Sequence, residues 1–149
     1  GFPMISVGYS NPTPWDSPRE LPEDQLLALI DKEAGKVSDP TRAIFNLHVP
    51  PKDTPIDQAV LVDAELRPVI KGGMPAIAGV GSSAVRTGVE RYQPMLALHG
   101  HIHESRGEAK LGRTLCLNPG SEYSEGVLRG VILTMSEKKG LKGYQLVSG

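Results

Sequence analysis

The chain has 149 residues, of which 39% are hydrophobic and 22% charged. This balance predicts a single domain over residues 1–149, and no apolar run approaches the roughly 18 residues of a membrane span. The formal net charge of −1 excludes a global field that would attract anionic lipid or nucleic acid, so neither partner is indicated. Cys116 is the only cysteine, which excludes an intramolecular disulfide framework and a thiolate metal cage and favours a cytoplasmic location.

The first half of the chain predicts two strands around one helix. Met4–Val7 is short and apolar enough for a strand, and the proline-rich segment 10–18 predicts an extended surface loop, which we expect Trp15 to order. Residues 22–34 predict a helix, because two acids fall in its first turn and four large aliphatic residues supply one buried face. Residues 42–49 are β-prone and stop at a double proline.

The second half predicts one helix and several strands. Residues 55–75 show no clean period and are interpreted as a long functional loop. Ser82 predicts the N-terminal cap of a helix over 83–92, and Pro94 follows as a stop. The remaining predicted strands are 95–98, 114–117, 127–135 and 144–147. This alternation indicates a layered α/β fold that ends in a β-meander.

Histidine is scarce, yet three of the four histidines lie at positions 99, 101 and 103, directly after a predicted strand. The fourth, His48, ends another predicted strand. Residues two apart on a strand share a face, so His101 and His103 are expected to direct their imidazoles into one pocket, with Gly100 allowing close backbone approach. Imidazole nitrogens bind borderline divalent ions such as Zn, Fe, Ni and Mn, whereas a solvated histidine-rich turn is the alternative for a bare H-x-H.

The surrounding residues carry a family resemblance. Gly100-His101-Ile102-His103 resembles the G-H-x-H block of calcineurin-like metallophosphoesterases, and Asn118-Pro119-Gly120-Ser121 resembles the N-P-G-S turn that often follows it. His48 resembles the lone histidine ligand that precedes this block, and the segment 10–14 with its following helix resembles the middle of small prokaryotic members. The likeness covers most of the chain.

The resemblance implies an αββα sandwich with a two-metal site that hydrolyses phosphomonoesters or phosphodiesters. His48 and His101 would bind one divalent ion and His103 the other, with an aspartate between the two ions. Such a hydrolase would take Mn, Fe, Zn or Ni, and acidification below a pH of roughly 6 would release the ions because bound imidazoles are neutral. No catalytic residue beyond the metal ligands and no organic cofactor site is assigned.

The family's other metal motifs, D-x-H, G-D-x-x-D and G-N-H-D/E, do not occur in the chain. The sequence therefore resembles the C-terminal half of a metallophosphoesterase domain, and alone it is expected to be weakly active or inactive. The alternative is a non-catalytic metal-binding or scaffold module. In a third interpretation, a separate chain supplies the other half and the metal site forms between the two chains. An exposed sheet edge would promote that pairing or self-association.

Other candidate residues have simpler interpretations. His99 precedes the family block and is interpreted as a packing residue that holds a ligand by a hydrogen bond, rather than as a third ligand. Glu104 is interpreted as solvated and Asn118 as shaping a turn. The glycines of 71–73 and 79–82 lack the spacing of a phosphate-binding P-loop, and no G-x-S-x-G serine nucleophile is present.

Overall fold

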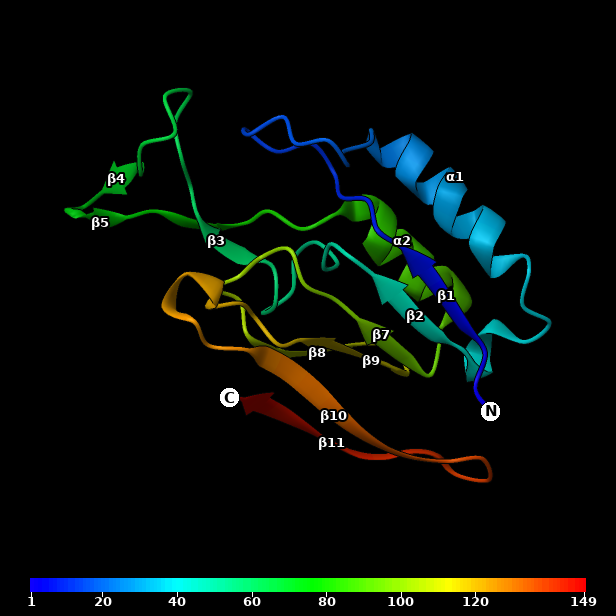
Figure 1. The fold of residues 1–149 in the computed structure, drawn as a ribbon. Coiled ribbons are helices and arrows are strands. Elements are labelled where there is room, and N and C mark those ends of the chain that lie inside the picture. The colour runs from blue at the N-terminus through cyan, green and yellow to red at the C-terminus, as the bar shows by residue number, and fades with distance from the viewer.

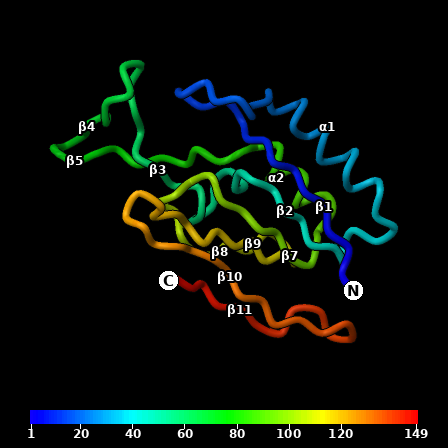
Figure 2. The backbone as a smooth tube through the Cα atoms, in the orientation of Figure 1, coloured from blue at the N-terminus to red at the C-terminus, as the bar shows by residue number.

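Two helices, a central five-stranded sheet and a β-hairpin form three layers in the computed structural model, which describes residues 1–149 (Figure 1). The sheet contains, in spatial order, β1 (Met4–Val7), β2 (Ile44–Leu47), β7 (Leu96–Leu98), β9 (Thr114–Asn118) and β8 (Gly107–Leu111). The first four strands are parallel to their neighbours, and β8 pairs antiparallel with β9. Although β1 and β2 are far apart in sequence, they lie side by side (Figure 2). The expected α/β class is confirmed.

The predicted helices α1 (Glu23–Ala34) and α2 (Ser83–Tyr92) are confirmed and cover one face of the sheet. In α1 the acids Glu23 and Asp24 occupy the first turn, where they oppose the positive end of the helix dipole. At the start of α2, the Ser82 hydroxyl oxygen accepts a hydrogen bond from the Val85 amide at 3.1 Å. The Glu23 carboxylate also accepts hydrogen bonds from the Ser83 and Ala84 amides, so α1 caps α2.

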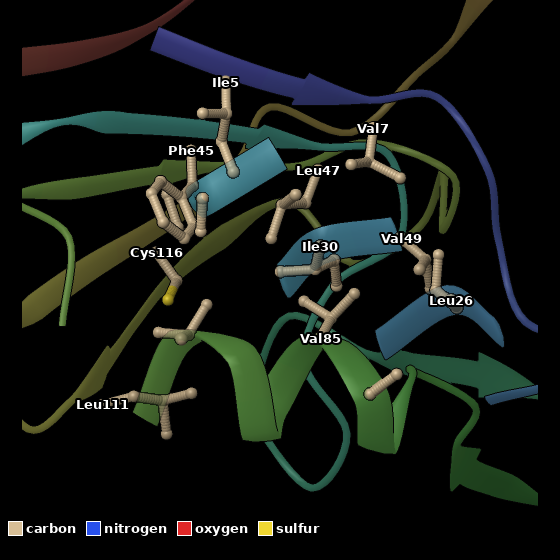
Figure 3. Close-up of a cluster of buried hydrophobic side chains, with 14 of the residues drawn as sticks. Ile5, Val7, Leu26, Ile30, Phe45, Leu47, Val49, Val85, Leu111 and Cys116 are labelled. Atoms are coloured by element: carbon tan, nitrogen blue, oxygen red, sulfur yellow. The ribbon is translucent and has the colours of Figure 1, made fainter. Parts of the chain in front are cut away.

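The main hydrophobic core lies between this helical layer and the sheet (Figure 3). Leu26, Ile30 and Ala34 recur every four residues on α1 and are fully buried. Phe45 extends from β2 into the same core, where its ring lies 6.0 Å from that of Tyr92. Burial of these apolar side chains fixes the positions of β2 and β7, which carry the histidine segments at their C-terminal ends.

The opposite face of the sheet is covered by the hairpin of β10 (Arg129–Ser136) and β11 (Gly140–Ser148). A second, smaller cluster of buried residues joins the two layers through Ile44, Leu96 and Leu117 of the sheet. Because β8 and β9 belong to the central sheet and β10 and β11 pair only with each other, the predicted β-meander is wrong. The chain ends in two separate hairpins, of which β8 was not expected from the sequence.

Residues 55–75, which the sequence predicted as a long functional loop, contain short strands that the sequence did not predict. They contribute to an arm with two antiparallel pairings, between β3 (Gln58–Val60) and β6 (Ile77–Gly79) and between β4 (Ile70–Lys71) and β5 (Met74–Pro75). The arm projects from the body of the molecule (Figure 1). Its strands have two or three residues each, which is too short for a clear alternating pattern. Neither helix of the chain is long and apolar enough to cross a bilayer.

The contact between the helices is closest at Gly88, where an added Cβ would lie 2.9 Å from Cγ2 of the buried Ile30. We predict that Gly88→Ala lowers the free energy of unfolding by about 1–2 kcal/mol, because overpacking outweighs the higher helix propensity of alanine. The neighbouring exposed Thr87→Ala should be neutral or slightly stabilising. Urea denaturation measures both changes, and a Gly88→Ala protein as stable as Thr87→Ala would contradict this packing.

Burial of Cys116 raises the pKa of its thiol to about 12. The side chain is fully inaccessible within the core, and only the thiolate reacts readily with thiol reagents. We therefore predict that a disulfide reagent such as Ellman's reagent labels Cys116 in urea but not in the native protein. Stoichiometric labelling of the native protein within minutes would show that this part of the core opens readily.

Candidate metal centre

His48 and His101 meet at the C-terminal ends of two neighbouring parallel strands. His48 directly follows β2 and His101 lies three residues after β7, in a register that pairs Asn46 with Leu98. Beyond the strands, the Gly100 amide donates a hydrogen bond to the His48 carbonyl oxygen at 2.9 Å. The two imidazole ring centroids are 5.0 Å apart, with an angle of 68° between the ring planes. Residues 53 positions apart in sequence therefore present their rings to each other.

The backbone at His101 is in the left-handed region, with φ of 64°. This conformation is uncommon for a residue with a side chain and costs on the order of 1–3 kcal/mol. It turns the chain out of the strand direction, so His101 reaches His48 from a turn and not from a strand. Gly100 is not needed for close approach, since an added Cβ would stay 4.0 Å from the nearest atoms of His48.

Partial burial lowers the pKa of both facing imidazoles. The His48 side chain is exposed at the surface, yet neighbouring atoms displace part of the water around its ring. This loss of hydration is the largest cause of the lowered pKa of His48, followed by the charges of His103 and Arg19. For His101, burial is again the largest cause, and the charge of His48 adds to it, while Glu20 acts in the opposite direction. Both rings are therefore neutral at neutral pH, with nitrogen lone pairs available to a metal ion.

Strand alternation does not place His103 beside His101, although the charge of His103 acts on both His48 and His101. The strand ends at Leu98, and the positive φ of His101 breaks the two-residue period. The exposed His103 ring instead lies 5.5 Å from the ring of Tyr123, in an edge-on arrangement. It borders a polar cavity of about 260 Å³ that Arg106 and Arg129 also line. No cluster of three or more His, Cys, Asp or Glu side chains has a geometry suited to a metal ion.

His99 is buried and contacts the backbone on both sides of His48. Its Nδ1 lies 3.0 Å from the Leu47 carbonyl oxygen and 3.1 Å from that of Val49. Because carbonyl oxygens only accept hydrogen bonds, the proton resides on Nδ1. Nε2 is buried and has no hydrogen-bond partner. The His99 ring thus holds the β2 terminus that carries His48, in line with the packing role expected from the sequence.

The turn at residues 118–121 supports the histidine segment from below. The buried Asn118 donates a hydrogen bond from Nδ2 to the Ile102 carbonyl oxygen at 2.9 Å and accepts one at Oδ1 from the Gly120 amide. Gly120 has φ of 72°, and an added Cβ would lie 2.8 Å from the His103 carbonyl oxygen. A side chain is therefore excluded at this position, and Asn118 shapes a turn as the sequence suggested.

Glu20 is a neighbour of the candidate site that the sequence analysis missed. Although burial raises its pKa, hydrogen bonds from Ser17 and Thr13 lower the value to about 2. Thr13 donates through its backbone amide and its hydroxyl, and Ser17 does the same. These bonds order the segment between β1 and α1. The expectation that Trp15 would order it is wrong, because 60% of the Trp15 surface is exposed.

The buried His99 makes stability depend on pH. Burial lowers its pKa from 6.5 to about 4, so the unfolded chain binds a proton between these values that the folded chain does not. We predict that stability present above pH 6.5 is lost as the pH falls toward 4, by up to about 3 kcal/mol. In His99→Gln, which keeps a donor but does not titrate, this contribution should vanish. An identical acid dependence in both proteins, measured by urea denaturation, would contradict the assignment.

Comparison with known proteins gives relatives that are longer than this chain. No family model matches the sequence. An uncharacterized protein of Methanocaldococcus jannaschii is 29% identical over 118 residues, which are 78% of this chain and 47% of that protein. A crystal structure with 19% identity superposes on 97% of this chain and 48% of its own, with a TM-score of 0.58. A Thermus thermophilus protein covers 85% of this chain and 46% of its own at 17% identity, with a TM-score of 0.44.

These similarities concern the fold. The superposition at a TM-score of 0.58 shows that this α/β arrangement recurs in a solved protein. The chain spans about half the length of the relatives that it matches.

Proposed function

We propose that this chain carries part of the metal site of a phosphoester hydrolase of the calcineurin-like metallophosphoesterase kind. The observation that carries the proposal is the meeting of His48 and His101, whose rings lie edge-on with centroids 5.0 Å apart at the ends of adjacent parallel strands. The C-terminal edge of parallel strands is a common position for binding sites in α/β folds. The proposed substrate is a phosphomonoester or phosphodiester, and the proposed location is the cytoplasm.

The layered arrangement supports this proposal. Helices, a mixed sheet and a second β-layer follow one another, which is the order expected for part of an αββα sandwich. In the proposed sandwich, the hairpin β10–β11 would belong to the second sheet. Its two strands pair only with each other, so further strands could extend that layer.

Within the site, this chain's residues supply and orient nitrogen ligands. His48 and His101 fit one divalent ion of the Mn, Fe, Zn or Ni type, because both imidazoles are neutral at neutral pH and their ring centroids are 5.0 Å apart. His99 holds the backbone beside His48, which fixes one ligand's position. His103 remains the proposed ligand of a second ion. When bound, such ions would polarise a phosphoryl oxygen and lower the pKa of a coordinated water.

A non-catalytic metal-binding or scaffold module is the second candidate function. It is favoured by the sequence, in which the family's D-x-H, G-D-x-x-D and G-N-H-D/E motifs do not occur. Two imidazoles alone bind an ion weakly, so a complete site requires carboxylates from another segment or chain. The free edge of β1 offers a place for such pairing or for self-association, since this strand pairs only with β2.

We predict that His101→Gly abolishes metal binding without destabilising the fold. Glycine adopts positive φ without strain, so the metal-free variant should gain about 1 kcal/mol of stability. Isothermal titration with Zn²⁺ measures binding, and urea denaturation in EDTA measures stability. Leu66→Gly is the matched control, because Leu66 also has positive φ, of 60°, and lies on the arm. Wild-type Zn²⁺ affinity in His101→Gly would overturn the proposed site.

Hydrolysis separates the two candidate functions. The assay measures the rate of hydrolysis of bis-p-nitrophenyl phosphate with added manganese. It uses this chain and a chain extended to the length of its relatives. The enzyme proposal expects turnover in the extended chain and its loss in the extended His101→Ala variant. Zn²⁺ binding without turnover in either chain would favour the non-catalytic module, whereas wild-type turnover in His101→Ala would exclude the histidine site from catalysis.

A further inference from the structure

A cavity of about 580 Å³ lies at the opposite end of the sheet from the histidines. Arg42 borders it just before β2, whereas His48 follows β2, so an extended strand separates the two regions by about 20 Å. The tip of the β10–β11 hairpin and the turn between β8 and β9 form its other walls. In Figure 1 this hairpin tip lies on the same side of the molecule as the N-terminus. None of the proposed metal ligands borders this cavity.

Positive charge is concentrated around this cavity, although the whole chain has a formal net charge of −1. Five basic side chains border it: Arg42, Lys110, Arg113, Lys138 and Lys139. Glu137 is the only acidic side chain in the lining.

Among these five basic groups, Arg42 donates a hydrogen bond at 3.3 Å to the Glu137 main-chain carbonyl oxygen, and its charge acts on the Glu137 carboxylate. None of the five forms a salt bridge within 4.0 Å, whereas elsewhere Arg67, Arg86 and Arg91 are all paired with acids. Hydrogen bonds from Thr41 lower the pKa of the Asp39 carboxyl, and the charges of Arg42 and Arg113 contribute, so this carboxylate offsets part of the positive charge. The cavity therefore has an excess of unneutralised positive charge, which favours a polyanionic ligand.

The cavity also has an apolar part. Met95 and Leu115 are among the four hydrophobic residues in its lining, next to the basic rim. Its volume falls within the range of small-molecule sites, which combine apolar walls with a few polar groups. Arginine binds phosphate in a bidentate manner, and lysine binds it as a point charge. We propose that this cavity binds a small phosphorylated organic molecule of nucleotide size, with phosphates on the basic rim and the organic part against the apolar wall.

A long nucleic acid fits these observations less well. Its phosphate backbone would need a basic stripe across the surface, whereas these side chains converge on one concavity of a chain without net positive charge. Because the cavity is separate from the histidines, its ligand binding does not depend on the proposed metal site or hydrolase function.

Isothermal titration with ATP, performed in EDTA at low salt so that no metal site contributes, tests the proposal. The test variant is Lys110→Ala combined with Arg113→Ala, since both residues are exposed and neither makes a salt bridge. The control is Lys32→Ala combined with Lys71→Ala, two exposed lysines outside the cavity. We expect the test variant to bind ATP at least about 10-fold more weakly than the wild type, the loss of about 1.4 kcal/mol. The control should bind like the wild type.

Two further probes define the ligand class. Inorganic tripolyphosphate should bind more weakly than ATP, because it lacks an organic part for the apolar wall. A 20-nucleotide single-stranded DNA should also compete less well than ATP at equal phosphate concentration. Undetectable ATP binding, equal ATP binding by the test variant, or tighter binding of either probe would overturn the proposal. Thermal unfolding by circular dichroism verifies that both double variants are folded.

Discussion

The parallel pairing of β2 with β7 is the constraint on which the candidate site depends. It aligns Ile44 with Leu96 and Asn46 with Leu98, so the segments that follow β2 and β7 leave the sheet side by side. The main-chain bond from Gly100 to His48 continues this pairing beyond the strands. The pairing is held in place by burial on both faces, with Phe45 toward the helices and Ile44 toward the hairpin. The positions of the His48 and His101 imidazoles are thus a consequence of core packing.

The histidine segment combines rigidity with local strain. His99 is held in the interior by hydrogen bonds to the two carbonyl oxygens that flank His48. His101, in contrast, adopts a left-handed backbone conformation. Strained residues persist where surrounding structure determines their conformation, and they concentrate at functional sites. Here Asn118 provides part of that support through its hydrogen bond to Ile102. The strain at His101 is therefore consistent with a site selected for geometry over stability.

Sequence patterns predicted those elements whose signals are local. Helix α2 was identifiable because the Ser82 cap, an apolar period and Pro94 agree. Strand β8 was missed because Gly107–Leu111 has low β-propensity and is a strand through its pairing with β9. The histidine positions were evident, but strand alternation could not predict their orientation once His101 took positive φ. Trp15 was expected to order the loop between β1 and α1, but the carboxylate of Glu20 orders that loop by accepting hydrogen bonds.

The central claim is that His48 and His101 bind one metal ion together. The most direct measurement is an anomalous difference map from crystals of this chain soaked in zinc chloride, collected above and below the zinc absorption edge. The account predicts a peak between the two rings, about 2.0–2.1 Å from one nitrogen of each imidazole. An ordered map with no peak between these rings, while zinc occupies other sites in the same crystal, would contradict the account.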